Sequence, residues 1–354
     1  MFLGPIIPLM DQPDLENAPP IPPPTPVKAA RKHYVLPYSL LIVFLITFFA
    51  GPLFIVALYA AGPFEEPVTV TIPKGASVQE ITQILDEQNV LVNPLLFRVA
   101  ARMMAKNVLR AGEYTFEPGM NVLDVTAKLR DGKTIVRQVT VPEGRTSYDI
   151  VNILAANPYL TGEIEAIPPE GSLLPETYHF THGDDRAQLV ARMQKDAQTL
   201  LEKLWAARAP DLPLKTPQEA LILASIIEKE TGKHEEERAR VAGVFVNRLR
   251  LGMPLQSDPT VIYALTDGMQ SLGRSLTRAD LLTDSPMNTY MAQGLPPRPI
   301  CNPGRAALDA ALHPENNEYL YFVADGSGGH AFSKTLSEHN SNVNQWIRLK
   351  KNVE

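Results

Sequence analysis

The sequence predicts an α+β protein with a single N-terminal transmembrane helix. Three observations support this fold class. A long apolar run without charges stands near the N-terminus, a strand–turn–helix pattern repeats after it, and capped amphipathic helices follow in the C-terminal half. The chain has 354 residues, 45% of them hydrophobic and 20% charged, so it can form two domains beyond the apolar run.

The first 33 residues differ in composition from the rest. Nine prolines fall within residues 1–30, and such density predicts a solvated, polyproline-like tail over 1–33. The following stretch, from His33 to Phe64, contains no Asp, Glu, Lys or Arg. About 20 apolar residues suffice to cross a bilayer as a helix, so we predict a transmembrane helix over 34–62.

The charges on either side of this segment predict its orientation. Basic residues precede it and acidic residues follow it, namely Lys28, Arg31 and Lys32 before and Glu65 and Glu66 after. The positive-inside rule therefore predicts a cytoplasmic tail and a periplasmic or extracytoplasmic body, in a single-pass protein of the inner (plasma) membrane. A cleaved signal peptide fits less well, because the apolar run is too long and no A-x-A site closes it.

Three segments after the apolar run align without gaps: 70–85, 114–129 and 139–154. Each predicts a strand, a turn glycine and an amphipathic helix that begins with a capping box. The turn glycines are Gly75, Gly119 and Gly144, the caps Ser77, Asn121 and Thr146, and the acids Glu80, Asp124 and Asp149. These units either build only a small α+β scaffold or form a glycan-recognition module. The first two resemble LysM-type cell-wall-binding domains, so we expect a LysM-like subdomain over 65–160 and a second domain over 161–354.

A well-marked helix begins the C-terminal half at Thr216. Thr216 is a typical N-cap, Pro217 occupies the first helical position, Glu219 completes a capping box and Gly232 ends the helix. A second helix runs from Ala239 to a stop at Gly252, and the glycine-rich segment 325–330 predicts a hairpin turn between two strands.

Glu230 continues the apolar stripe of the first of these helices. Leu223, Ile226 and Ile227 form one face, and the next position on that face is Glu230. Burial and the negative end of the helix dipole both disfavour a carboxylate there, so its pKa is expected to be raised. A protonated glutamic acid suits general acid catalysis, whereas a structural ion pair is the alternative.

Composition excludes several other classes. The net charge of −6 argues against nucleic-acid binding, which requires a basic surface. One cysteine, Cys301, cannot form an intramolecular disulfide or a multi-thiolate metal site. His179 and His182 lack a third ligand at zinc-site spacing. We therefore expect no metal, no cofactor and no nucleic-acid partner.

The segment ASIIEKETG, residues 224–232, resembles the MltG/YceG endolytic murein transglycosylases, once widely labelled aminodeoxychorismate lyase-like. Further matching segments are LLPETY, VFVNRLRLGMPLQSDPTVIYAL, NTY followed by GLPP, and YLYFVADGSGGHAFSKTLSEHN. The resemblance extends from the apolar run to the C-terminus. It implies a LysM-like membrane-proximal subdomain and an α+β catalytic domain.

The resemblance also implies site residues. The family's catalytic glutamate matches Glu230. The residues expected to line the cleft and bind substrate are Gln256, Asp258, Thr260, Asn288, Thr289 and Tyr290, with Glu176, Asn302 and His330 as further candidates. This chain departs from the family pattern at Met287, where a tyrosine is common, and at Arg298, where the family has a glycine. Arg298 would carry a backbone cost if that glycine requires a positive φ.

By resemblance, the activity is lytic cleavage of the MurNAc–GlcNAc bond of nascent peptidoglycan with formation of a 1,6-anhydroMurNAc end. Such cleavage would terminate glycan elongation, and the implied partners are glycan strands, the membrane and peptidoglycan synthases. Two alternatives stay open. A muramidase-type hydrolase would use a second carboxylate, such as Asp258 or Glu176. A non-catalytic cell-wall-binding scaffold would not depend on Glu230.

Overall fold

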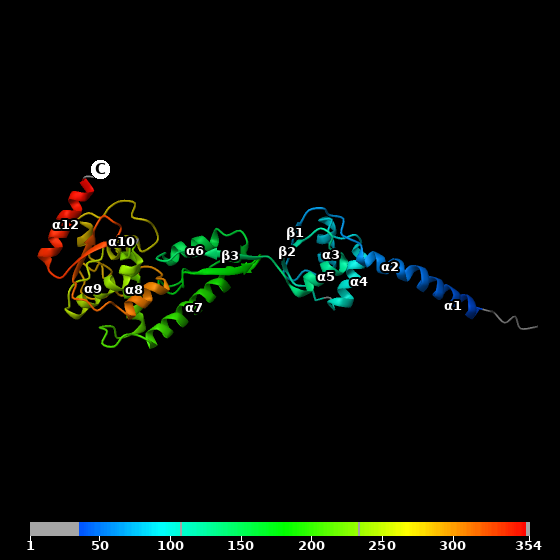
Figure 1. The fold of residues 1–354 in the computed structure, drawn as a ribbon, viewed down its shortest axis with the longest axis horizontal. Helices are drawn as coiled ribbons and strands as arrows, with labels where there is room; N and C mark the ends of the chain where they lie inside the picture. The colour runs from blue at the N-terminus through cyan, green and yellow to red at the C-terminus, as the bar shows by residue number, and fades with distance from the viewer. Residues whose placement is uncertain (1–34, 107, 233, 352–354) are drawn as a thin grey trace, which may run out of the picture. The chain divides into compact units, whose positions relative to one another are not determined.

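The computed structural model describes residues 35–106, 108–232 and 234–351 (Figure 1). The predicted Pro-rich tail, 1–33, lies outside the described residues. The chain divides after Ala57 into two compact units.

The first unit contains the apolar helix, which continues to Tyr59. It consists of α1 (Val35–Leu45), the π-helical turn η2 (Ile46–Ala50) and α2 (Gly51–Tyr59). The π turn ends two residues before Pro52, which lacks an amide N–H and would clash with the carbonyl four residues back in a regular helix. Among the described residues, one helix, Ser39–Tyr59, is long and apolar enough to cross a membrane. The predicted helix is thus confirmed as a helix.

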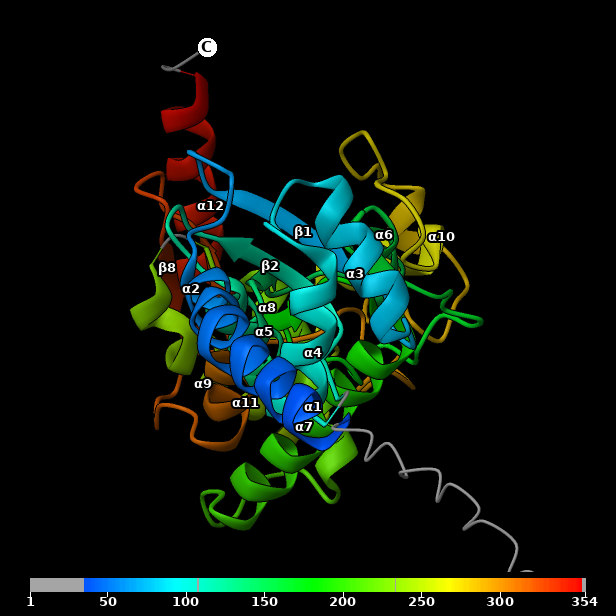
Figure 2. The same ribbon diagram turned by 90° about the vertical axis from the view of Figure 1, so that its right-hand side faces the viewer.

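The described residues of the second unit form three hydrophobic cores. The first core covers Phe64 to Leu129 and includes the first two repeated segments. Its elements are β1 (Val68–Ile72), α3 (Val78–Glu87), α4 (Pro94–Met104), β2 (Gly112–Phe116) and α5 (Val122–Asp131). β1 and β2 pair antiparallel, with Val70 opposite Tyr114, and α3 packs against β1 and α4 (Figure 2). The chain order from β1 to β2 is strand, helix, helix, strand.

The third repeated segment packs in the second core, which covers Val139 to Met193. Its elements are β3 (Val136–Thr140), α6 (Ser147–Ala155), β4 (Leu160–Thr161), β5 (Thr177–Thr181), β6 (Asp184–Asp185) and α7 (Arg186–Ala206). β3 and β5 pair antiparallel, and β4 and β6 pair parallel. The repeat in the sequence therefore crosses from one core to the next.

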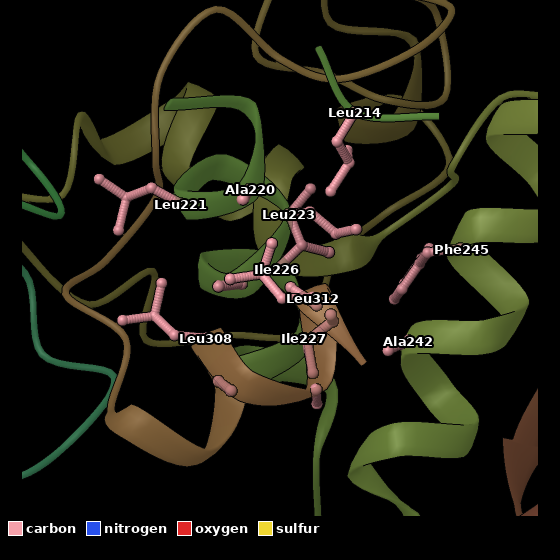
Figure 3. Packing of buried hydrophobic residues seen from close by; sticks show 14 of the residues in the cluster. Leu214, Ala220, Leu221, Leu223, Ile226, Ile227, Ala242, Phe245, Leu308 and Leu312 are labelled. Carbon is pink, nitrogen blue, oxygen red and sulfur yellow. The ribbon is translucent and has the colours of Figure 1, made fainter. Parts of the chain in front are cut away.

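The third core surrounds α8 (Pro217–Glu230), whose residues 220 to 227 are all buried. Figure 3 shows Ile226 and Ile227 pointing toward α11 (Arg305–Leu312) and α9 (Arg238–Arg250), which contribute Leu308, Leu312 and Phe245. This packing fixes the C-terminal end of α8. The remaining elements are η3 (Glu235–Glu237), α10 (Asp258–Thr266), η4 (Asp280–Leu282), β7 (Tyr321–Ala324), β8 (His330–Ser333) and α12 (Leu336–Lys351).

Most predicted turns and caps are confirmed. All three turn glycines have positive φ, and the capping boxes at Ser77 and Asn121 are complete. At the third unit only half of the box forms: Thr146 accepts the N–H of Asp149, whose carboxylate instead lies 3.8 Å from the Arg145 guanidinium. The hairpin at 325–330 is confirmed as the turn between the antiparallel strands β7 and β8.

Two details of α8 differ from the prediction. Thr216 caps the helix, but the Glu219 carboxylate accepts the N–H of Lys215 rather than that of the cap residue. The helix ends at Glu230 through an extended Thr231, and Gly232 does not take a positive φ. Gly232 is required for close approach instead, because a Cβ there would stand 2.7 Å from the Gly328 carbonyl oxygen.

Candidate functional site

Glu230 is the last residue of α8, at the edge of the third core. The residue is half-buried, and desolvation by the surrounding protein acts on its carboxyl group. Burial raises the pKa of Glu230 above its ordinary value, and the nearby Asp258 charge raises this pKa further. The sequence prediction of a raised pKa is therefore confirmed, and the protonated acid is favoured.

Ser257 supplies a hydrogen bond to this carboxyl group. Its Oγ donates to Glu230 Oε1 at 2.6 Å, and this bond opposes the rise in the pKa of Glu230. Ser257 stands at the N-cap of α10, yet its side chain makes no capping bond. The hydroxyl is thus diverted from helix capping to the carboxyl group. Sequence reasoning missed Ser257, although a cap-type residue directly before Asp258 and Pro259 was a signal.

Asp258 and Tyr290 form a second polar pair near Glu230. The Tyr290 hydroxyl donates to Asp258 Oδ1 at 2.6 Å. Burial raises the pKa of Tyr290, and the Asp258 bond and the Glu230 charge act in the same direction. Tyr290 therefore remains a neutral donor, and Asp258 keeps an exposed carboxylate close enough to influence Glu230.

Three of the other predicted residues of this region are buried and shape the loop, whereas Gln256 faces solvent. Thr260 and Thr289 are fully buried and bond to each other at 2.9 Å, and the Thr289 hydroxyl accepts the N–H of Ser257. Gln256 is exposed and has a φ of +50°, held by its N–H bond to the Thr289 carbonyl. Asn288 is buried, and its amide donates to the carbonyls at 281 and 283. The strained backbone thus directly precedes the serine that contacts the acid.

His330 opens β8 and is held by Glu237. Its Nδ1 lies 2.9 Å from Glu237 Oε2, and its backbone N–H donates to Glu237 Oε1 at 3.3 Å. Both side chains are largely buried, at 13% and 16% exposed. His330 lies close to the residues that follow α8, because its Cε1 is 3.9 Å from the position that a Cβ would take at Gly232, and Glu237 was not predicted from the sequence.

Arg248 supports the same loop from α9. Its guanidinium donates to the carbonyls of Leu320 at 2.6 Å and Leu255 at 2.7 Å, and it is only 7% exposed. Burial lowers the pKa of Arg248, while the Tyr290 and Glu230 charges oppose that shift. The buried cation ties β7 to the segment that leads into Ser257. It was missed because an arginine on a helix usually faces solvent.

Glu176 and Asn302 do not join this group. Glu176 is exposed and lies near Glu143, a residue that precedes α6 and whose pKa is raised mainly by burial and in part by neighbouring carboxylates, Glu176 among them. Asn302 is fully buried and joins separate chain segments: Oδ1 accepts the N–H of Leu173 at 2.9 Å, and Nδ2 donates to the Arg145 carbonyl at 3.1 Å. The structure therefore gives Asn302 a connecting position between α6 and the segment before α11.

The two positions that depart from the family pattern are accommodated without backbone strain. Met287 is buried in the third core. Arg298 does not have a positive φ; its guanidinium pairs with Asp267 and lies 5.5 Å from the centroid of the Tyr263 ring. Arg298 therefore does not carry the backbone strain that a positive φ would have caused.

Within the described residues, no group of three or more His, Cys, Asp or Glu side chains is arranged to hold a metal ion. The titratable groups near Glu230 instead form hydrogen-bonded pairs, Asp258 with Tyr290 and Glu237 with His330. The arrangement can donate a proton from Glu230 and stabilise the resulting carboxylate through Ser257.

Glu170 is a second carboxyl with a strongly perturbed pKa, away from the acid. Burial raises the pKa of Glu170 to about 7, although both carboxyl oxygens accept the N–H of Ser147, at 3.0 and 3.1 Å. A folded-state pKa above the unfolded one means that the folded protein binds the proton more tightly. This stabilisation is fully present below about pH 4.5, the unfolded value, and is lost as pH rises through about 7.

We expect Glu170→Gln to flatten the pH dependence of stability. Between pH 5 and pH 8 the free energy of unfolding of the wild type should fall by about 1–2 kcal/mol more than that of the variant, after allowance for partial exposure. Thermal or denaturant unfolding at both pH values measures this difference. Glu163→Gln, at an exposed position of the same segment, is the control. Parallel curves for wild type and Glu170→Gln would contradict the assignment.

Comparison with known proteins assigns the chain to a family. A family model described as the YceG-like family matches residues 70–345. The chain is 32% identical over 319 residues to a Bacillus subtilis (strain 168) protein named endolytic murein transglycosylase, covering 80% of this chain and 86% of that protein. It is 29% identical over 334 residues to the Streptococcus pneumoniae (strain D39) protein of the same name, covering 80% of this chain and 59% of that protein.

A solved structure of a yceG-like protein from Listeria monocytogenes is 34% identical and matches with a TM-score of 0.48, covering 78% of this chain and 99% of that one. The family model covers most of the chain, beginning within β1 and ending within α12. The chain therefore belongs to the YceG-like family.

Proposed function

We propose that this protein is an endolytic murein transglycosylase, a lyase that cleaves the MurNAc–GlcNAc bond within peptidoglycan strands. The observation that carries the proposal is the carboxyl group of Glu230 at the end of α8, whose pKa is raised by burial and whose Oε1 accepts the hydrogen bond of Ser257. The names of the B. subtilis and S. pneumoniae relatives support the same activity.

The first half of the reaction uses the protonated acid. Glu230 donates its proton to the glycosidic oxygen as the bond between that oxygen and C1 of MurNAc breaks, which releases the GlcNAc side with a free hydroxyl. Positive charge then develops at C1 and its ring oxygen. Asp258, exposed and close enough to act on Glu230, adds negative potential that favours this charge.

The second half uses the carboxylate that remains. Glu230 accepts the proton of the MurNAc O6 hydroxyl while O6 attacks C1, which gives a 1,6-anhydro end and returns the acid to its protonated form. No water is consumed. Ser257 bonds Oε1 and so stabilises the carboxylate between the two steps. Among the described residues, no protein donor contacts Oε2, the oxygen that would carry the proton.

His330 is proposed as a substrate-facing group positioned by Glu237. The bond from Nδ1 to Glu237 fixes the imidazole ring, which leaves Nε2 directed away from this carboxylate. The backbone bond between His330 and Glu237 fixes the same loop a second time. By contrast, the buried residues Thr260, Thr289 and Asn288 are proposed to act by shaping the loop.

The apolar helix is proposed to anchor the protein in the inner membrane, with the tail cytoplasmic and the catalytic part periplasmic. The length and composition of Ser39–Tyr59 support the anchor, and the charges that flank the apolar run support the orientation. The strand–helix–helix–strand order of the first core supports a LysM-like wall-binding module within 65–160. Peptidoglycan synthases are proposed as partners of an enzyme held beside nascent strands.

Digestion of isolated glycan strands by the full chain tests the activity. We expect shortened strands that end in 1,6-anhydroMurNAc, detected by chromatography and mass spectrometry. Release of single disaccharides from strand ends without internal cuts would contradict an endolytic enzyme. Intact strands after incubation with folded protein would contradict the proposed activity as a whole.

The pH profile should depend on Ser257. Because the general acid must be protonated, kcat/KM falls as pH rises through the raised pKa of Glu230. Ser257→Ala removes a bond that lowers this pKa, so the alkaline limb should move up by about one pH unit while the maximal rate falls about tenfold. Ser341→Ala, at an exposed position of α12, is the control. A profile that moves to lower pH would contradict the role of this bond.

A further inference from the structure

A cavity of ≈ 850 Å³ lies beside the C-terminal end of α8 and has no part in the proton transfers proposed for Glu230. One wall consists of the segment that leads into α6, with Glu143 and Arg145, and the first turn of α6, with Asp149. The lining is completed by Lys229 of α8, by one face of α10 and the loop that follows it to residue 274, and by Ile300. Its volume lies in the range of ligand sites, about 300–1,000 Å³.

The cavity begins one residue away from the proposed site on two different elements. Lys229 lines it and directly precedes Glu230, and Pro259 lines it and directly follows Asp258. Consecutive Cα atoms are about 3.8 Å apart. A short chain that starts at the acid can therefore extend into the cavity, although the acid does not line it. Glu230 itself is not part of the lining.

Two basic side chains of the lining, Lys229 and Arg145, form few hydrogen bonds or ion pairs with the rest of the described protein. Lys229 Nζ has a single long bond, 3.4 Å, to the Gly144 carbonyl, and it forms no ion pair within the described residues. Arg145 lies 3.8 Å from Asp149 without a hydrogen bond between them. Arg274, by contrast, is bound to Asp280 through two bonds of 2.6 and 3.0 Å. Arg145 and Lys229 flank Gly144 and have donors to spare for an anion.

The lining favours a charged ligand over further sugar units of a glycan strand. Tyr263 is the one aromatic residue in the described lining, and the Arg298 guanidinium lies over its ring. The described lining therefore has no free aromatic face on which a sugar ring could stack. Carboxylates are offered as well as cations, because Glu143 and Asp149 stand on the same wall as Arg145. A ligand with several carboxylates and an amine complements this set.

We propose that this cavity binds the peptide stem carried by MurNAc, with stem carboxylates on Arg145 and Lys229 and the amine of its diamino acid toward Glu143 or Asp149. The proposal rests on the proposed function. The stem is attached to the lactyl group of the sugar whose C1 reacts, so it starts beside Glu230. Three to five extended residues reach about 10–18 Å, enough to enter the neighbouring cavity. Stem binding would thus position the scissile bond.

The test measures binding rather than turnover. Full-length Glu230→Gln protein in detergent is titrated with fluorescent glycan strands that carry peptide stems and with the same strands after amidase removal of the stems. We expect tighter binding of the strands with stems. Adding Arg145→Ala and Lys229→Ala should weaken that binding on the order of tenfold and change binding of the stripped strands less than twofold. Lys203→Ala, at an exposed position of α7, is the control.

An equal loss on both kinds of strand would overturn the proposal in favour of a sugar subsite. Equal affinity for the two kinds of strand before substitution would overturn it too. Neither result depends on cleavage, whereas failure of the wild type to cut any strand contradicts the proposed activity. The two failures are therefore distinguishable.

Discussion

Glu230→Gln is expected to abolish strand cleavage, with a loss of about 10³-fold or more in kcat. The amide keeps the shape of the side chain and can accept the Ser257 hydrogen bond. It can neither donate a proton to the glycosidic oxygen nor take one from O6, so both halves of the reaction lose their proton carrier. The measurement is the rate of new anhydro ends formed per enzyme.

Glu228→Gln is the matched control for this substitution. Glu228 lies on the same helix two residues earlier, and its Oε2 accepts the N–H of Gly304 at 3.0 Å. A glutamine can accept that bond through its carbonyl oxygen, so activity should stay within about threefold of the wild type. If Glu228→Gln were inactive and Glu230→Gln active, the acid would be wrongly assigned. If both were fully active, a non-catalytic scaffold would be favoured.

Asn302→Ala is expected to destabilise the fold by about 3 kcal/mol. The side chain makes four hydrogen bonds, with the N–H of Leu173, the carbonyl of Arg145, the hydroxyl of Ser147 and the carboxyl group of Glu170. Each partner left without a hydrogen bond costs about 1–3 kcal/mol. The thermal midpoint should fall by about 5–10 °C in circular dichroism or scanning fluorimetry.

This measurement separates two roles for Asn302. Family resemblance implies a cleft residue, whereas its full burial indicates a connection between chain segments. An unchanged midpoint with lost activity would favour direct substrate contact and contradict the structural role. Asn344→Ala, at an exposed position of α12, is the control and should leave the midpoint in place.

The local features of this fold follow from the sequence because they depend on neighbours along the chain. Turn glycines, most caps and the buried stripe of α8 need only a few consecutive residues. Glu230 could be predicted in the same way, because it continues the apolar stripe and its carboxyl group must then lie at the edge of the core. The raised pKa follows from that position.

The partners of Glu230 could not be predicted from the sequence, because they come from segments that are distant along the chain. Ser257 reaches the acid only when the start of α10 meets the end of α8, and Glu237 meets His330 across 93 residues. The need for glycine at position 232 is likewise explained only by the Gly328 carbonyl, which lies too close to leave room for a Cβ. The repeated pattern did not reveal that its third unit joins a different core, since periodicity specifies a face but not what covers it.

Cleavage in ¹⁸O-labelled water distinguishes an intramolecular attack driven by one acid from an attack by water. Glycan strands are digested by the full chain in labelled water, and the new ends are analysed by mass spectrometry. We expect anhydro ends that contain no label, with Glu230→Gln producing no new ends. Reducing ends that each carry one labelled oxygen would contradict the lytic mechanism, since they would require attack by water and a second carboxylate, with Asp258 the first to examine.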